Sequence, residues 1–109
     1  MKIYNLPRRP GKTYQLVSLV DMYTMFGDTP IWILGCNLGM IDHIKYRIHR
    51  INIPTNNTNI IKFGVLFEDF APLHIPKHIL VDEYDLCNKH AIETFKDYYE
   101  DRLIMFGTP

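Results

Sequence analysis

The chain has 109 residues, its 12 Lys and Arg balance its 12 Asp and Glu, and 47% of its residues are hydrophobic. These values predict one domain, residues 1–109, with a packed core, and they exclude a disordered chain and nucleic-acid binding through overall charge. No apolar run approaches the roughly 20 residues of a membrane span and no signal-peptide pattern is present, so we expect no membrane partner. Two cysteines without paired spacing indicate free thiols in a cytoplasmic protein.

The first third of the chain predicts a strand, a helix and a second strand. Residues 2–5 form a short strand-like run, and residues 13–26 place apolar side chains at helical spacing before a Gly-Asp-Thr-Pro turn. Residues 31–34 are continuously apolar and rich in residues that favour strands, which predicts a buried strand of a parallel sheet with Trp32 in the core. The buried face of the helix is marked by Leu16, Val17, Val20 and Tyr23.

A second helix follows, with one apolar face and basic side chains on the others. Asn37 is suited to cap this helix. Residues 54–59 then form a polar loop, and residues 60–67 predict a third strand in which Gly64 is a candidate bulge. The apolar face carries Ile41, Ile44, Ile48 and Ile51, and the basic stripe consists of His43, Lys45, Arg47, His49 and Arg50.

The last third of the chain predicts a loop, a strand and a final helix. Residues 68–77 contain two prolines and predict an exposed loop, and residues 78–83 predict a fourth strand that ends in two acids. Asn88 is suited to cap the last helix, and residues 105–109 form either a tail or one more short strand. The buried face of this helix is predicted to consist of Ala91, Ile92, Phe95, Tyr99 and Leu103.

This order of elements predicts an α/β fold, a three-layer sandwich in which a mostly parallel sheet of about four strands has helices on both faces. Ligands of such sheets bind beyond the carboxyl ends of the strands. Residues 6–13 and residues 82–83 should both lie at that edge, although they are far apart in the chain.

Residues 6–13, LPRRPGKT, have the form that ends a phosphate-binding loop, G-x-x-x-x-G-K-[ST]. A turn between a strand and a helix points backbone N–H groups and the helix N-terminus at one place, where an anion is stabilised. In that turn, Gly11 lets the backbone approach a phosphate, Lys12 supplies an ammonium for the outer phosphates, and Thr13 supplies a hydroxyl ligand for Mg²⁺.

The loop departs from the motif at two positions. Leu6 replaces the first glycine and cannot easily take a positive φ, and Pro10 removes one N–H donor. Arg8 and Arg9 either restore positive charge to the loop or are simply solvated.

Residues 79–83, ILVDE, have the form of a Walker B segment, an apolar strand followed by Asp and Glu. Asp82 would hold Mg²⁺ through its water shell, and Glu83 would orient and polarise the water that attacks the γ-phosphate. The alternative for this pair is two solvated acids at the end of a strand.

Together the two motifs resemble the P-loop NTPases, in particular the ATPase branch with an Asp-Glu Walker B, and the chain looks like a small bacteriophage-encoded member. The resemblance implies ATP and Mg²⁺ as ligands in the host cytoplasm, with residues 8–13 around the phosphates. It also implies Thr13 and Asp82 on Mg²⁺ and Glu83 as the catalytic carboxylate.

The resemblance also sets a topological expectation. This branch normally has five strands, and the strand after Walker B carries a polar sensor, for which residues 102–106 are the candidate here. If that strand is missing, the 79–82 strand should pair directly with the 2–5 strand.

These patterns predict a nucleotide-binding protein, a weak or accessory ATPase in phage DNA metabolism that works beside a host or phage replication protein. The alternative is a decayed P-loop fold that binds and inhibits or modulates a host protein. A third reading is a nucleic-acid adaptor that contacts phosphates through Lys45, Arg47 and Arg50, a stripe that is otherwise solvated surface.

Overall fold

The structure is a computed structural model. Several sequence predictions fall wholly or partly on residues that it does not describe: the loop residues Leu6, Arg8, Arg9 and Pro10, the polar loop 54–59, residues 66–68 and 71–74, the cap Asn88, the side chain of Ala91, and residues 108–109. The described residues are 2–5, 11–53, 60–65, 69–70, 75–87 and 89–107.

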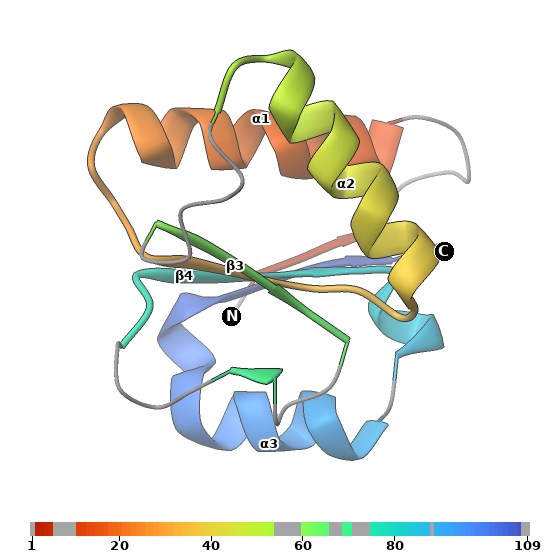
Figure 1. The fold of residues 1–109 in the computed structure, drawn as a ribbon. Coiled ribbons are helices and arrows are strands. Elements are labelled where there is room, and N and C mark those ends of the chain that lie inside the picture. Colours follow the sequence, from red (N-terminus) through yellow and green to blue (C-terminus); the bar gives the residue numbers. More distant parts are fainter. Residues whose placement is uncertain are drawn as a thin grey trace.

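The described residues form one five-stranded sheet in the order β1-β5-β4-β2-β3, and its strand pairs are parallel (Figure 1). Helices α1 and α2 cover one face of the sheet and α3 covers the other, which confirms the predicted α/β three-layer fold. The strands are β1 (Lys2–Asn5), β2 (Ile31–Leu34), β3 (Ile61–Gly64), β4 (His78–Asp82) and β5 (Leu103–Gly107), and the helices are α1 (Gly11–Met25), α2 (Leu38–Arg50) and α3 (Lys89–Tyr99).

The fifth strand decides the topology at the centre of the sheet. Residues 103–107 form β5, which lies between β1 and β4, so the 79–82 strand does not pair with the 2–5 strand. Every residue of β5 is buried, as expected for a strand covered on both faces. Leu103 therefore belongs to this strand, and its predicted place on the last helix is wrong.

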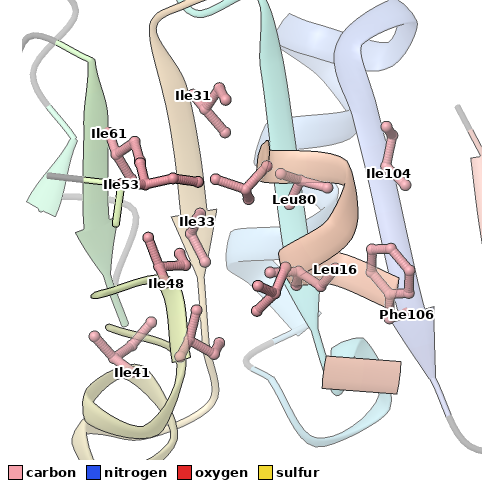
Figure 2. Packing of buried hydrophobic residues seen from close by; sticks show 13 residues of the cluster. Leu16, Ile31, Ile33, Ile41, Ile48, Ile53, Ile61, Leu80, Ile104 and Phe106 are labelled. Atoms are coloured by element: carbon pink, nitrogen blue, oxygen red, sulfur yellow. The ribbon is translucent and has the colours of Figure 1, made fainter. Parts of the chain in front are cut away.

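The strands bury alternate side chains on the two faces. The larger cluster lies under α1 and α2 (Figure 2), and it includes Ile31 and Ile33 of β2 and Leu80 of β4. The smaller cluster lies under α3 and includes the predicted core residue Trp32, which is 3% exposed. This separation follows from the pleat of each strand, because successive side chains point to opposite faces.

Helices α1 and α2 bury the faces that their periodicity predicts, with one exception. Leu16, Val17 and Val20 of α1 are buried, and Tyr23 packs against the same cluster. Ile51 is 43% exposed because α2 ends at Arg50 and Ile51 is already its C-cap. The buried residues of α2 are Ile41, Ile44 and Ile48.

The third strand is shorter than predicted. β3 ends at Gly64, and its register with β2 is uninterrupted, so Gly64 is not a bulge. Instead, a Cβ on Gly64 would lie 2.8 Å from the ring of Phe70. Phe70 is 5% exposed, and the centre of its ring lies 5.0 Å from that of Trp32. The segment predicted as an exposed loop thus contributes a core residue.

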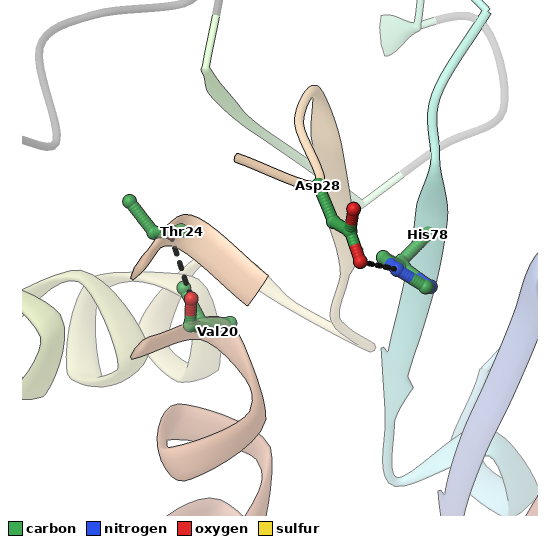
Figure 3. Close-up of polar contacts among 4 residues, drawn as sticks. All are labelled: Val20, Thr24, Asp28 and His78. Carbon is green, nitrogen blue, oxygen red and sulfur yellow. Dashed lines mark hydrogen bonds and ion pairs between the residues drawn. The ribbon is translucent and has the colours of Figure 1, made fainter. Parts of the chain in front are cut away.

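The turn after α1 is attached to the amino end of β4 (Figure 3). The Asp28 carboxylate lies 3.6 Å from Nε2 of His78, and the His78 ring stacks on Tyr23 at 3.6 Å. Near the end of the helix, the Thr24 hydroxyl donates a 2.7 Å hydrogen bond to the Val20 carbonyl. These contacts hold the carboxyl end of α1 beside the amino end of β4. The first turn of α1 therefore lies at the opposite edge, where the strands end.

Candidate functional site

The parallel sheet brings the two predicted motifs to one edge. Figure 1 shows that α1 begins at the edge where β4 and β5 end. The register places Asp82 opposite Phe106 of β5, and Phe106 opposite Tyr4 of β1. Asp82 is thus level with Tyr4, one residue before the end of β1. Two strand spacings separate β1 from β4, which is about 10 Å.

Asp82 is a buried acid at the end of its strand. It is 2% exposed, and no other charged side chain among the described residues is buried. The Cys87 thiol donates a 3.5 Å hydrogen bond to the Asp82 backbone carbonyl. An ionised carboxylate at such a position is costly unless positive charge or hydrogen-bond donors lie close to it. The alternative of two solvated acids is therefore wrong for Asp82.

Glu83 follows β4 directly and has a left-handed backbone conformation. Its φ of 51° and ψ of 52° lie in the region that non-glycine residues rarely adopt, and its side chain is half-buried. The strand therefore stops at Asp82, one residue earlier than predicted. A short 3₁₀ turn, η2 (Tyr84–Leu86), follows, in which the Leu86 N–H donates to the Glu83 carbonyl at 2.9 Å.

Tyr84 closes the edge beside this acidic pair. A Cβ placed on Gly107, the last residue of β5, would lie 2.2 Å from Cε1 of Tyr84. The ring therefore occupies the space that a side chain at position 107 would need. This contact holds η2 against β5 and fixes where the chain leaves Asp82 and Glu83.

The other half of the site is the first turn of α1. Gly11 and Lys12 belong to this turn, and the Lys12 side chain is not among the parts that the structure describes. Thr13 is half-buried in the same turn. Arg8 and Arg9 belong to the segment that the structure does not describe. Whether the Lys12 ammonium reaches Asp82 therefore stays a prediction.

Asn37 lies at this edge as well, and its side chain caps α2 as predicted. Its Oδ1 accepts a 2.8 Å hydrogen bond from the Met40 N–H, and its Nδ2 donates to Sγ of Cys36 at 3.4 Å. Both polar atoms of the Asn37 amide are therefore hydrogen-bonded, and the residue stabilises the start of α2.

The oxygen ligands at this edge fit Mg²⁺ better than a transition metal. Thr13 and Asp82 offer a hydroxyl and a carboxylate, and a Mg²⁺ ion that is shared with substrate phosphates needs one or two such protein ligands. Within the described ranges, no group of three His, Cys, Asp or Glu residues could hold a metal ion.

β5, the strand that follows β4 in the chain, carries no polar side chain. β5 reads LIMFG, and Arg102, at its start, lies at the amino edge of the sheet, away from Asp82. Thr108 follows Gly107 in the sequence and lies outside the described residues. The polar sensor that the resemblance implies is therefore not found in β5.

A second feature is a groove of about 590 Å³ between α1 and α2. Sequence reasoning identified its basic side, Arg47 and Arg50, but missed that Tyr14 and Tyr46 face the same space. The signal was that both tyrosines lie away from the apolar positions that the spacing marks as buried on the two helices. The lining residues are Tyr14, Val17, Ser18, Asp21, His43, Tyr46, Arg47, Arg50 and Ile51.

No family model, no curated protein and no solved structure matches the chain. Its function is therefore argued from its own residues. Among the residues that the structure describes, no helix has the length and apolar character needed to cross a membrane.

Proposed function

We propose that the chain binds ATP with Mg²⁺ at the carboxyl edge of the sheet and hydrolyses it slowly. The observation that carries this proposal is the position of Asp82, which is buried at the end of β4 and level with the end of β1. Residues 11–13, the end of the phosphate-loop motif, begin α1 at the same edge. A bound triphosphate and its ion would span the distance between the two motifs.

The topology supports the same proposal. The ATPase branch that the sequence resembles has a strand between the loop-bearing strand and the Walker B strand. β5 lies at that place between β1 and β4.

In this proposal each residue has one task. The first turn of α1 and Lys12 bind the phosphates, and Thr13 and Asp82 hold Mg²⁺, which neutralises phosphate charge. Glu83 holds and polarises the attacking water. Such catalysis consists mainly of positioning and charge stabilisation, so a site without a sensor in β5 should turn over slowly.

Isothermal titration with Mg–ATP tests the proposal. Wild type should bind, and Lys12→Ala should lose binding, whereas Lys77→Ala removes the same charge just before β4, at the opposite edge of the sheet, and should leave the affinity unchanged. Glu83→Gln should bind ATP and lose phosphate release. Equal affinities for wild type and Lys12→Ala would show that the assignment of Lys12 is wrong.

A second candidate is a decayed P-loop fold that binds a host protein. The exposed apolar residues at the end of α1 favour it: Met22, Met25 and Phe26 are 40%, 78% and 75% exposed. Neighbouring apolar side chains of this kind are typical of protein interfaces. In this case, a complex with the host protein forms with or without ATP, and replacing Met25 and Phe26 by Lys weakens it. Mg–ATP turnover by the wild type would reject this candidate.

A further inference from the structure

We propose that the groove between α1 and α2 binds single-stranded nucleic acid, with phosphates along α2 and bases along α1. The groove is open to solvent, and nothing in the nucleotide proposal uses it. Its floor is apolar, since Val17 is 7% exposed. Its walls are polar and aromatic, and the two walls differ in charge.

The α2 wall is cationic. Arg47 and Arg50 both line the groove and lie one turn apart on the helix. The Arg47 Nε donates a 3.0 Å hydrogen bond to Nε2 of His43, which fixes the guanidinium along the groove. Two guanidinium groups in a row match the successive phosphates of a nucleic-acid backbone.

The α1 wall suits bases rather than phosphates. It contributes Tyr14, Ser18 and Asp21, and the Asp21 carboxylate would repel a phosphate placed beside it. A carboxylate and a hydroxyl instead accept hydrogen bonds from the N–H groups of bases, such as the amino groups of adenine and cytosine or the N3–H of thymine. The charge difference between the two walls thus gives a strand one orientation across the groove.

Two tyrosine rings offer stacking surfaces. Tyr14 is 65% exposed and Tyr46 is 59% exposed, one on each wall. The Arg50 guanidinium carbon lies 5.8 Å from the centre of the Tyr46 ring, so the cation and the ring are presented together. Bases of a single strand stack on such rings, whereas a duplex keeps the faces of its bases covered. The aromatic walls therefore select the single-stranded form.

The test is fluorescence anisotropy of a labelled 20-nucleotide oligo-dT at several salt concentrations, without nucleotide. The double variant Arg47→Ala/Arg50→Ala should weaken binding at least tenfold and lower the slope of log K against log salt by about 1.4, because each lost phosphate contact of a single strand contributes about 0.7. The control Lys89→Ala/Arg102→Ala removes two exposed charges elsewhere and should bind as wild type does.

Stacking and the place of binding need separate variants. Tyr14→Ala on the base-binding wall should weaken binding about tenfold, and Tyr14→Phe should restore it, since the ring remains. Lys12→Ala should leave strand binding intact, so this inference can fail or hold independently of the ATP proposal. Circular dichroism checks that each variant is folded, which is expected because the replaced side chains lie on the surface.

Four results would overturn the inference. These are absence of binding at low salt, equal affinity of the double variant and its control, tighter binding of duplex than of single strand, and competition by poly-glutamate as strong as that by unlabelled oligo-dT. The last result would show that the groove recognises negative charge alone.

Discussion

Replacing Gly107 by alanine tests whether the edge of the site is built as the structure shows. The added Cβ would lie 2.2 Å from Cε1, 2.8 Å from Cδ1 and 3.0 Å from Cζ of Tyr84. Carbon atoms in contact prefer about 3.5–4.0 Å, so the ring must withdraw by roughly 1 Å or more. Gly107 is buried and paired with Asn5 of β1, and the residue before it, Phe106, is paired on both sides, so the backbone has little room to move instead.

Overpacking of this kind costs about 1–3 kcal/mol. In a domain of this size, a loss of about 2 kcal/mol lowers the melting temperature by roughly 10 °C. Urea denaturation measures it well, because Trp32 is the single tryptophan of the chain and is 3% exposed, so its fluorescence reports unfolding. The midpoint should fall while the slope of free energy against urea stays unchanged.

A double-mutant cycle identifies the cause. Tyr84→Ala removes the ring, and in this background Gly107→Ala should cost less than about 0.5 kcal/mol, which gives a coupling energy of at least about 0.5 kcal/mol. If Gly107→Ala is tolerated in wild type, or remains equally costly without the Tyr84 ring, the packing argument is wrong. Because Tyr84 follows Glu83 directly, displacement of its ring should also move the acidic pair and reduce any ATP turnover.

Three further substitutions test the fold and the site by urea denaturation. Phe70→Ala should cost about 3–5 kcal/mol, because it empties the space beside Trp32, and a cost below 1 kcal/mol would place Phe70 outside the core. Asn37→Ala should cost about 0.5–2 kcal/mol through loss of the bond to the Met40 N–H, while Asn37→Ser keeps most of the stability. Glu83→Gly should be more stable than Glu83→Ala by about 1 kcal/mol, since both remove the carboxylate and glycine alone adopts φ of 51° without strain; equal stabilities would contradict the left-handed backbone.

Local periodicity predicts most of the fold. The apolar run 31–34 and the helical spacing of Leu16, Val17 and Val20 are properties of neighbouring residues, and they place these side chains in the core correctly. The common edge of the two motifs follows from one further rule, that strands linked by helices run parallel. Sequence reasoning could therefore locate the candidate site before the order of the strands was known.

The features that the sequence did not predict depend on contacts between distant residues. Phe70 lies between acids and prolines, and its burial is decided by Trp32 and the space above Gly64. For the end of the chain the sequence left a tail and a short strand as alternatives, and residues 103–107 become a central strand because β1 and β4 leave a place between them. The groove requires α1 and α2 to pack together, which no pattern within either helix specifies.

Three departures from local preference lie at the carboxyl edge. Asp82 is a charged residue at a buried position, Glu83 takes a backbone conformation that suits glycine, and Gly107 is kept bare beneath the Tyr84 ring. Each lowers stability or limits the sequence, and each concerns the two acids or the segment that follows them. In proteins whose local and global preferences otherwise agree, such conflicts mark positions where function outweighs stability. This concentration of strain around Asp82 and Glu83 is a reason, independent of the motifs, to look for the chemistry of the protein at this edge.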